Sequence, residues 1–331
     1  MSGTKVSGES QQAVFCLGVD GGQSHTKVAI GDRHGTIVGR GTAGPCNHVR
    51  SGEGREKLRR AVTEAVSEAL APLGRGFEDT RFAAACFGMS GGPEDKRELL
   101  AELLSCDRLE VTTDADIALW GGTGGQPGVV VIAGTGSMAF GRNASGRTMR
   151  AGGWGYLYGD EGGAFDVVRN ALRAALRDEE GWGPSTRLRP ALLEAGGAAD
   201  VNDLLHRFYT DEFPRQRVAA LAPLVNEVAA AGDGVAKAVL VEAGQRLAGY
   251  GAAVRQRLFE PGETVPVVPV GGAFNSQFVQ EGFRGALKGT ATEVVAPRFD
   301  PAAGALLWAY ALGKVEVDLG RFAANASQGA S

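Results

Sequence analysis

The sequence predicts an α/β protein made of two similar domains, and three observations support this. At 331 residues the chain is longer than one compact α/β unit usually is, so two domains are expected. Its hydrophobic share of 44% and charged share of 22% are those of an ordinary soluble protein with ample core. One order of elements (strand, hairpin tip rich in glycine and hydroxyl groups, strand, turn, strand) occurs twice, which indicates an internal duplication.

The first half of the chain begins with three predicted antiparallel strands that are joined by two hairpins. Helices and strands then alternate, because apolar residues recur at helical spacing and then fill a short buried run. In order, the predicted elements are strands Val14–Val19, Lys27–Ile30 and Thr36–Val38, helix Glu56–Leu70, strand Phe82–Phe87, helix Glu94–Leu104 and strand Leu109–Thr113.

The second half repeats this plan. Its predicted elements are strands Val129–Ala133, Met138–Phe140 and Thr148–Arg150, helices over Phe165–Arg177 and most of 217–258, strand Val265–Val270, a helix from Ser276, strand Glu293–Ala296 and helix Pro301–Leu312. We therefore expect a first domain of residues 13–117 to which a C-terminal helix at 300–315 returns. The second domain is expected at 118–299, with a disordered N-terminus at 1–12 and a tail at 316–331.

Charge and cysteine usage exclude several classes of protein. The formal net charge of −4 includes no basic stripe, so a nucleic-acid partner is not expected. No apolar run reaches the ~18 residues of a membrane span, and the polar first dozen residues lack the apolar core of a signal peptide. The four cysteines are far apart and form no C-x-x-C pair, which argues against zinc and iron–sulfur sites. We expect a cytoplasmic protein with reduced thiols.

Two hairpin tips have the composition of phosphate-binding loops. The first begins with Asp20-Gly21-Gly22, and the second is Gly134-Thr135-Gly136-Ser137. Glycine lets backbone N–H groups approach an anion closely, and hydroxyl groups add donors. Asp20 is a candidate Mg²⁺ ligand, since hard cations prefer oxygen. Either tip alone is most often a simple turn, but one in each domain predicts a clamp on a polyphosphate. Neither matches the P-loop or the dinucleotide fingerprint.

A carboxylate follows the strand that ends at Thr113. In an open α/β sheet this position faces the crevice where ligands bind, so Asp114 is a candidate general base for phosphoryl transfer. The alternative is that Asp114 or Asp116 caps the helix that is predicted to start near Ile117. The two roles are compatible if one of these carboxylates caps the helix and the other acts in catalysis.

The glycine-rich segment 152–163 is the most distinctive part of the sequence. Its backbone leaves room for a ligand, Trp154 is a candidate for packing on a sugar ring, and Asp160 or Glu161 can accept sugar hydroxyls. Aromatic residues also fill protein cores, and Asp160 is equally well placed to cap the following helix. Asn47 offers an amide to a hydroxyl or acetamido group.

Together these segments resemble the N-acetylglucosamine kinase branch of the actin/hexokinase/Hsp70 superfamily, the same broad group as the BadF/BadG/BcrA/BcrD ATPases. The resemblance covers the chain from about Phe15 to Leu312. It implies two ribonuclease H-like (actin-like ATPase) domains, each a mixed sheet flanked by helices, facing across an interdomain cleft. The matching motifs, in family order, are Asp20-Gly21-Gly22, Asn47-His48, Gly88-Met89-Ser90-Gly91-Gly92, Thr113-Asp114-Ala115, Gly134-Thr135-Gly136-Ser137, Gly152-Gly153-Trp154-Gly155, Gly159-Asp160-Glu161-Gly162 and Val270-Gly271-Gly272.

The resemblance implies a kinase that uses ATP and Mg²⁺ to phosphorylate an amino sugar at its 6-hydroxyl, with N-acetylglucosamine as the first expectation. Asp114 would be the catalytic base. The residues implied at ATP are Gly22, Ser24, Thr135, Gly136, Ala222, Gly271, Gly272 and Ser276. Those implied at the sugar are Asn47, Asp114, Ser137, Met138, Gly153, Trp154, Gly155 and Asp160.

The first hairpin departs from the family pattern, because Gln23 and Ser24 stand where the family has glycine and threonine. Ser24 keeps a hydroxyl donor, so phosphate binding is still expected. Three alternatives stay open: a kinase for glucosamine, N-acetylmuramate or another hexose, an ATPase module without a sugar substrate, and a structural protein with a decayed site. Homodimers are common in the family, so a homodimer is among the expectations.

Overall fold

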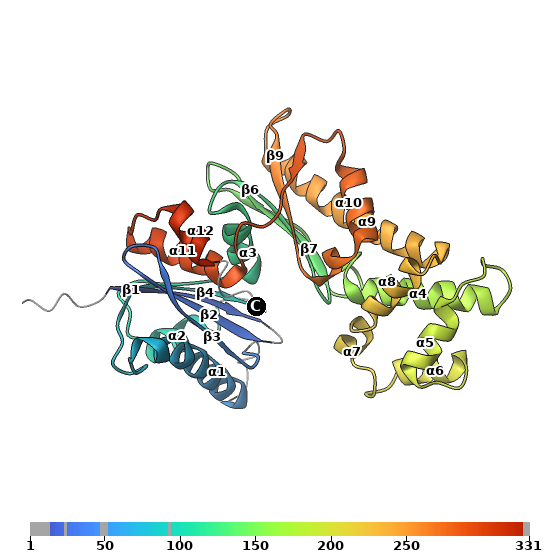
Figure 1. Ribbon diagram of the computed structural model, residues 1–331, viewed down its shortest axis with the longest axis horizontal. Coiled ribbons are helices and arrows are strands. Elements are labelled where there is room, and N and C mark those ends of the chain that lie inside the picture. The colour runs from blue at the N-terminus through green and yellow to red at the C-terminus, as the bar shows by residue number, and fades with distance from the viewer. Residues whose placement is uncertain (1–13, 23–24, 47–51, 92–93, 327–331) are drawn as a thin grey trace, which may run out of the picture. The chain divides into compact units, whose positions relative to one another are not determined.

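The computed structural model describes residues 14–22, 25–46, 52–91 and 94–326, and the chain divides into two compact units (Figure 1). The first unit takes the chain up to Gly125 and again from Arg298 onward, and the second takes Gln126–Pro297. Each unit is a mixed sheet flanked by helices, so the predicted two-domain α/β fold is confirmed.

The first unit contains a five-stranded sheet with the order β3-β2-β1-β4-β5. Its strands are β1 (Phe15–Gly21), β2 (Thr26–Asp32), β3 (Ile37–Ala43), β4 (Phe82–Met89) and β5 (Leu109–Thr112). β1 pairs antiparallel with β2 and parallel with β4, and β4 pairs parallel with β5. The carboxyl ends of β1, β4 and β5 therefore lie at one edge of the sheet.

Helices cover both faces of this sheet (Figure 1). One face carries α1 (Gly52–Leu70), the short η1 (Ala71–Leu73) and α2 (Arg97–Leu103), and the other carries α3 (Asp114–Thr123), α11 (Pro301–Gly313) and α12 (Leu319–Ala326). Alternate residues of β1 enter the two cores, since Leu17 packs toward α1 and Cys16 toward α11. At Gly18 a Cβ would overlap the backbone of Leu306, so glycine here lets α11 lie close against the sheet.

The second unit repeats this topology, with a sheet of order β10-β9-β6-β7-β8. Its strands are β6 (Gly128–Ala133), β7 (Ser137–Arg142), β8 (Thr148–Gly152), β9 (Val265–Val270) and β10 (Thr292–Val294). β6 pairs antiparallel with β7 and parallel with β9, as β1 does with β2 and β4. Read from the other edge, the order is β8-β7-β6-β9-β10, and each strand then has its counterpart in β3-β2-β1-β4-β5. This agreement supports the duplication predicted from the hairpins.

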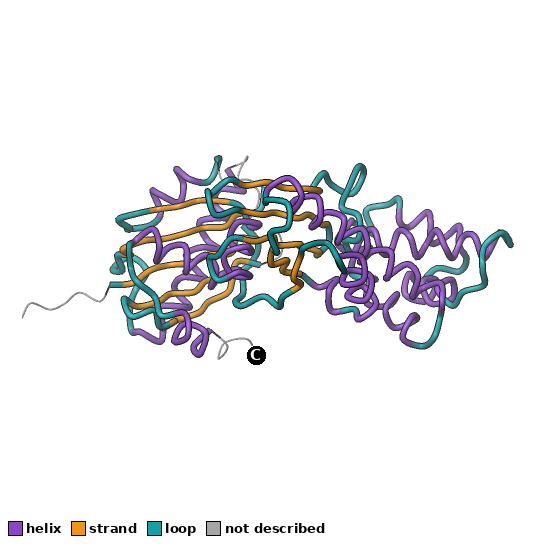
Figure 2. Tube along the Cα trace, turned by 90° about the horizontal axis from the view of Figure 1, so that it is seen from above, coloured by secondary structure: helices purple, strands orange, loops and turns teal. Residues whose placement is uncertain are grey.

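The helices of the second unit pack on its sheet and on one another. The long α9 (Gly234–Leu258) lies on β6, β7 and β8, and α10 (Gln277–Leu287) packs against α9. The others are α4 (Ala164–Glu179), α5 (Leu188–Gly196), α6 (Val201–Phe208), α7 (Arg215–Ala219), α8 (Ala222–Ala230) and the short η2 (Gly272–Asn275). Figure 2 shows the strands of both units in orange and the helices in purple. In the described part of the chain, no helix combines the length and apolar character needed to cross a membrane.

The unit boundaries differ from the expected ones. A boundary at 117/118 would divide α3, which packs along α11 and belongs wholly to the first unit. The crossings lie after Gly125 and after Pro297. The expected disorder at 1–12 lies outside the described residues.

The segment 316–331 is more than a tail. It contains α12, whose Phe322 is buried and meets Phe299 and Tyr310 edge to face. α5 and α6 were also not predicted. Both are short. α6 nevertheless has apolar residues at helical spacing, Val201, Leu204, Leu205 and Phe208, and the sequence analysis missed this pattern.

Candidate functional site

Two carboxylates mark the carboxyl edge of the first sheet. Asp20 is the next-to-last residue of β1, and Asp114 opens α3 shortly after β5. Burial, followed by repulsion from Asp114, raises the pKa of Asp20 from 3.8 to about 6, although Lys27 opposes the change. A divalent cation would stabilise the ionised form of such a carboxylate, which is buried and lies beside a second negative charge.

Asp114 is not the cap of its helix. Thr113 holds the N-cap position, and its hydroxyl oxygen accepts the N–H of Asp116 at 3.2 Å. Asp116 in turn accepts hydrogen bonds from the hydroxyls of Thr112 and Thr113, at 2.8 and 2.6 Å. Of the two roles that the sequence left open, capping is therefore served by Thr113 and by neither aspartate. Asp114 Oδ1 accepts the N–H of Ala115 at 2.9 Å, which holds the carboxylate at the start of α3.

Ser90 orients the Asp114 carboxylate. Its hydroxyl donates to Asp114 Oδ2 at 2.7 Å, and its N–H donates to the carbonyl of Gly21 at 3.0 Å, which fixes Ser90 against the end of β1. Ser90 belongs to a motif that the sequence analysis quoted, but no role was assigned to it. The signal that could have found it is its position directly after β4, at the edge where Asp20 and Asp114 lie.

The described part of the first hairpin is closed by the N–H of Gly22, which donates to the carbonyl of His25 at 2.9 Å. Ser24 and Asn47, which were expected at ATP and at the sugar, lie outside the described residues. Among the residues that are described, no three or more His, Cys, Asp or Glu side chains form a metal cluster. A single carboxylate such as Asp20 is compatible with Mg²⁺ that arrives with ligands of its own, as a nucleotide complex does, since Mg²⁺ commonly takes only one or two protein carboxylates.

The second hairpin, Gly134-Thr135-Gly136, connects β6 to β7 and lies against the start of α4. Its carbonyls at Gly134 and Thr135 accept the N–H groups of Ala164 and Phe165, at 2.8 and 3.2 Å. Within the described ranges, the N–H groups of Thr135 and Gly136 have no protein acceptor. Free backbone donors on a glycine-rich tip are suited to phosphate oxygens.

A pocket of about 410 Å³ opens beside this hairpin. Ala222, Gly272 and Ser276, three of the residues expected at ATP, line it together with Gly134. Ser276 also caps α10, because its hydroxyl oxygen accepts the N–H of Val279. Gly271 does not line the pocket. Its φ of 109° turns the chain out of β9, a conformation that favours glycine.

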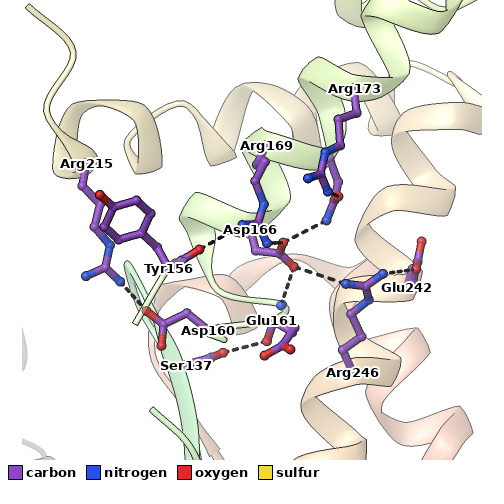
Figure 3. Close-up of polar contacts among 12 residues, drawn as sticks. Ser137, Tyr156, Asp160, Glu161, Asp166, Arg169, Arg173, Arg215, Glu242 and Arg246 are labelled. Carbon is purple, nitrogen blue, oxygen red and sulfur yellow. Dashed lines mark hydrogen bonds and ion pairs between the residues drawn. The ribbon is translucent and has the colours of Figure 1, made fainter. Parts of the chain in front are cut away.

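Three of the residues expected at the sugar lie together where β7 and β8 meet. The carbonyl of Ser137 accepts the N–H of Gly153 at 3.0 Å, and Met138 pairs with Gly152 across the two strands. The Ser137 hydroxyl donates to the carbonyl of Glu161 at 2.6 Å, which ties β7 to the loop that carries Asp160 (Figure 3).

Trp154 and Gly155 follow in the turn after β8. The Trp154 side chain is 66% exposed, and the guanidinium of Arg150 lies over its ring, 4.8 Å from the centroid. The carbonyl of Gly155 accepts the N–H groups of Tyr158 and Gly159, so the turn folds back on itself. The indole is thus exposed with a cation against it, and its packing on a sugar ring stays a prediction.

Asp160 is paired with Arg215, a residue that the sequence analysis did not single out. The Arg215 Nη2 atom lies 2.5 Å from Asp160 Oδ2, and Asp160 is only 5% exposed (Figure 3). Asp160 does not cap α4, because Gly163 holds that position. Its φ of 60° lies in the left-handed region, which few residues other than glycine adopt.

Neighbouring side chains stabilise the loop that carries Asp160 and its left-handed backbone conformation. The buried Asp166 accepts the N–H of Gly162 at 2.9 Å and is itself paired with Arg169 at 2.5 Å (Figure 3). The hydroxyl of Tyr250 donates to the carboxylate of Glu161. Strained backbone persists where the surroundings over-determine it, and such sites are commonly functional.

Comparison with known proteins relates this chain to amino-sugar kinases. It is 32% identical over 276 residues to an N-acetylmuramic acid/N-acetylglucosamine kinase of Clostridium acetobutylicum, which covers 82% of this chain and 89% of that protein. It is 31% identical over 270 residues to an N-acetyl-D-glucosamine kinase of Dictyostelium discoideum, with coverage of 77% and 84%.

Solved structures and a family model agree with this relationship. A structure from Chromobacterium violaceum, provisionally assigned as an N-acetylglucosamine kinase, matches with a TM-score of 0.70 and 28% identity over 89% of this chain and 98% of that one. The model of the BadF/BadG/BcrA/BcrD ATPase family matches residues 17–309. The chain therefore belongs to the BadF/BadG/BcrA/BcrD ATPase family.

Proposed function

We propose that this protein transfers the terminal phosphoryl group of ATP to the 6-hydroxyl of an amino sugar, with N-acetylglucosamine as the principal substrate. The observation that carries the proposal is the Asp114 carboxylate, which is oriented by Ser90, lies near Asp20 and does not hold the N-cap position of α3. Membership of an ATPase family supports the use of ATP. The names of the two curated relatives support an amino sugar.

The second unit would bind the nucleotide. Its pocket of about 410 Å³ has the size and the mostly small, apolar walls of a small-molecule site. Gly134 belongs both to the pocket and to the hairpin, so an adenosine in the pocket would send its phosphates along that hairpin. The N–H groups of Thr135 and Gly136 would then donate to phosphate oxygens.

Asp20 would hold Mg²⁺, directly or through a water molecule. When it is bound with ATP, Mg²⁺ neutralises charge on the phosphates and so favours attack on the terminal phosphorus. The high pKa of the free Asp20 carboxylate, about 6, agrees with a side chain whose natural partner is a cation.

Asp114 would act as the general base. It accepts the proton of the sugar 6-hydroxyl while that oxygen forms a bond to the terminal phosphorus of ATP. The bond from this phosphorus to the bridging oxygen breaks, and ADP leaves with the electron pair. Ser90 keeps the carboxylate in one orientation throughout. The sugar would be held by Ser137, Gly153 and Asp160 of the second unit.

Coupled ADP release tests the proposal with ATP·Mg²⁺ and a panel of N-acetylglucosamine, glucosamine, N-acetylmuramic acid, N-acetylmannosamine and glucose. We expect turnover to be concentrated on N-acetylglucosamine, with the 6-phosphate as the product identified by NMR. If turnover is concentrated on another sugar of the panel, the protein is still a sugar kinase, but its principal substrate is that sugar. ADP release that is the same with every sugar and with none would overturn the proposal in favour of an ATPase module.

A further inference from the structure

Arg215 lies against the second hairpin as well as against Asp160. A Cβ added to Gly136 would lie 2.7 Å from Arg215 Nη2 and would overlap Asp160 Oδ2. The guanidinium therefore sits beside the hairpin residue whose backbone N–H is free. The ring of Tyr156, 5.3 Å from the guanidinium carbon, supports it on a further side (Figure 3).

The helix that carries Arg215 is anchored independently of this contact. Val218, one turn further along α7, is buried in a small apolar cluster with Val168 and Phe213. This cluster holds α7 against α4, the helix that also supports the hairpin. Packing thus places the backbone of Arg215, and the ion pair with Asp160 places its guanidinium beside Gly136.

Only part of the hydrogen-bonding capacity of Arg215 is used. A guanidinium has five N–H donors. One Nη2 donor goes to Asp160, and Nε is buried without a partner among the residues that the structure describes. The side chain is 28% exposed, so the donors at the end of the guanidinium, unlike the buried Nε, are accessible to a ligand.

The two ends of the hairpin face different surroundings. The pocket adjoins Gly134, whereas Arg215 and Asp160 adjoin Gly136. A nucleotide whose base fills the pocket would extend its phosphates from Gly134 toward Gly136. The end of the chain of phosphates, and with it the group that is transferred, would then reach Arg215.

We infer that Arg215 is a catalytic residue that binds the transferring phosphoryl group, an inference that rests on the proposed function. The charge of this group spreads over three oxygens during transfer, and a planar guanidinium donates to such oxygens in pairs. Arg215 forms no covalent bond and takes up no proton. Asp160 holds the guanidinium in place before ATP binds and can accept a sugar hydroxyl at its other oxygen.

The test compares R215M and R215K with R217M. Arg217 is a matched control on the same helix, because its guanidinium also lies over an aromatic ring, that of Phe213, but has no contact with the hairpin. We expect R215M to lower kcat on N-acetylglucosamine on the order of 10³-fold, with the sugar KM nearly unchanged. R215K should regain part of the loss, and R217M should keep the rate of the unaltered protein.

A second measurement needs no sugar. Calorimetric titration should show R215M losing about tenfold in affinity for ATP while its affinity for ADP, which lacks the terminal phosphate, is unchanged. This difference also shows that the variant is folded. It can be measured even if the sugar panel refutes the proposed function.

Three results would overturn the inference. One is an R215M enzyme with normal kcat and a raised sugar KM, which would make Arg215 a residue that only positions Asp160. Another is a loss confined to N-acetylmuramic acid, which would mean that Arg215 binds a carboxylate on the sugar. The third is equal weakening of ATP and ADP binding.

Discussion

Replacement of Asp20 by asparagine should stabilise the first unit and abolish activity. In the folded protein the pKa of Asp20 is about 6 instead of 3.8, because of burial and of repulsion from Asp114. Each pKa unit corresponds to about 1.4 kcal/mol, so keeping Asp20 ionised near neutral pH costs about 3 kcal/mol of the free energy of unfolding. Asparagine has nearly the same shape and carries no charge, so D20N should recover much of this amount.

The stability that D20N gains should decrease as the pH falls. Because the folded pKa is raised, the folded protein binds more protons than the unfolded chain between about pH 4 and pH 6. The natural protein therefore becomes more stable as the pH falls through this window, while D20N has no such group. The advantage of D20N should be full above about pH 6, shrink through the window and vanish below about pH 4.

Thermal unfolding without nucleotide or Mg²⁺ measures this effect. For a domain of this size, about 3 kcal/mol corresponds to a rise in Tm of up to about 10 °C. D107N is a suitable control, because Asp107 is an exposed carboxylate whose ion pair with Arg81 contributes little. Coupled ADP release on the same samples should show that D20N has lost turnover.

Two results would refute the reasoning. If D20N unfolds at a lower temperature than the natural protein at about pH 8, the Asp20 carboxylate is favourably placed and its pKa is not raised. If the difference in Tm is the same at about pH 5 and pH 8, the gain comes from something other than charge. Added Mg²⁺ should raise the Tm of the natural protein and leave that of D20N unchanged.

Three further substitutions test other parts of the site. D114N should keep sugar affinity in calorimetry and lose about 10²- to 10⁴-fold in kcat, whereas a normal rate would refute its role as general base. S90A should lower kcat about tenfold with little change in sugar KM, because the Asp114 carboxylate loses the donor that orients it at 2.7 Å. G136A should weaken both ATP and sugar binding, since its Cβ would overlap Asp160 and crowd Arg215. G249A is its control, because Gly249 of α9 lies outside the hairpin and the pocket and a Cβ there meets no atom within 4 Å; equal effects of the two would count against the role of Gly136.

Much of the fold could be predicted because its signals are local. β1 and β6 are apolar runs that end at glycine-rich tips, and their hairpin partners follow at once. α3 was placed three residues too late, because Ile117 is its first large apolar residue, while Thr113 and Asp116 supply the capping hydrogen bonds earlier. The order of the strands within each sheet is set by pairing over long distances, and the sequence analysis did not predict it.

The site could be predicted where a residue belongs to a motif and not where its role arises from a distant contact. Asp114 follows β5, Thr135 lies at the tip between β6 and β7, and Asp160 lies in the glycine-rich segment 152–163, so a role for each could be hypothesised from its neighbours in sequence. Ser90 lies 24 residues from Asp114, and Arg215 lies 55 residues from Asp160. Arg215 begins a helix of five residues, and no local pattern distinguishes it from other surface arginines.

The charges at the two candidate sites imply a division of tasks. In the described part of the first unit, the edge with Asp20 and Asp114 presents carboxylates, which repel a polyphosphate unless a cation is bound. The hairpin of the second unit presents free N–H groups and an arginine, which attract it without a metal. ATP binding should therefore depend mainly on the second unit, and Mg²⁺ should matter more for turnover than for nucleotide affinity. An acidic residue that destabilises the fold by about 3 kcal/mol is expected to persist only where the reaction needs it, and Asp20 meets that condition if it carries the metal.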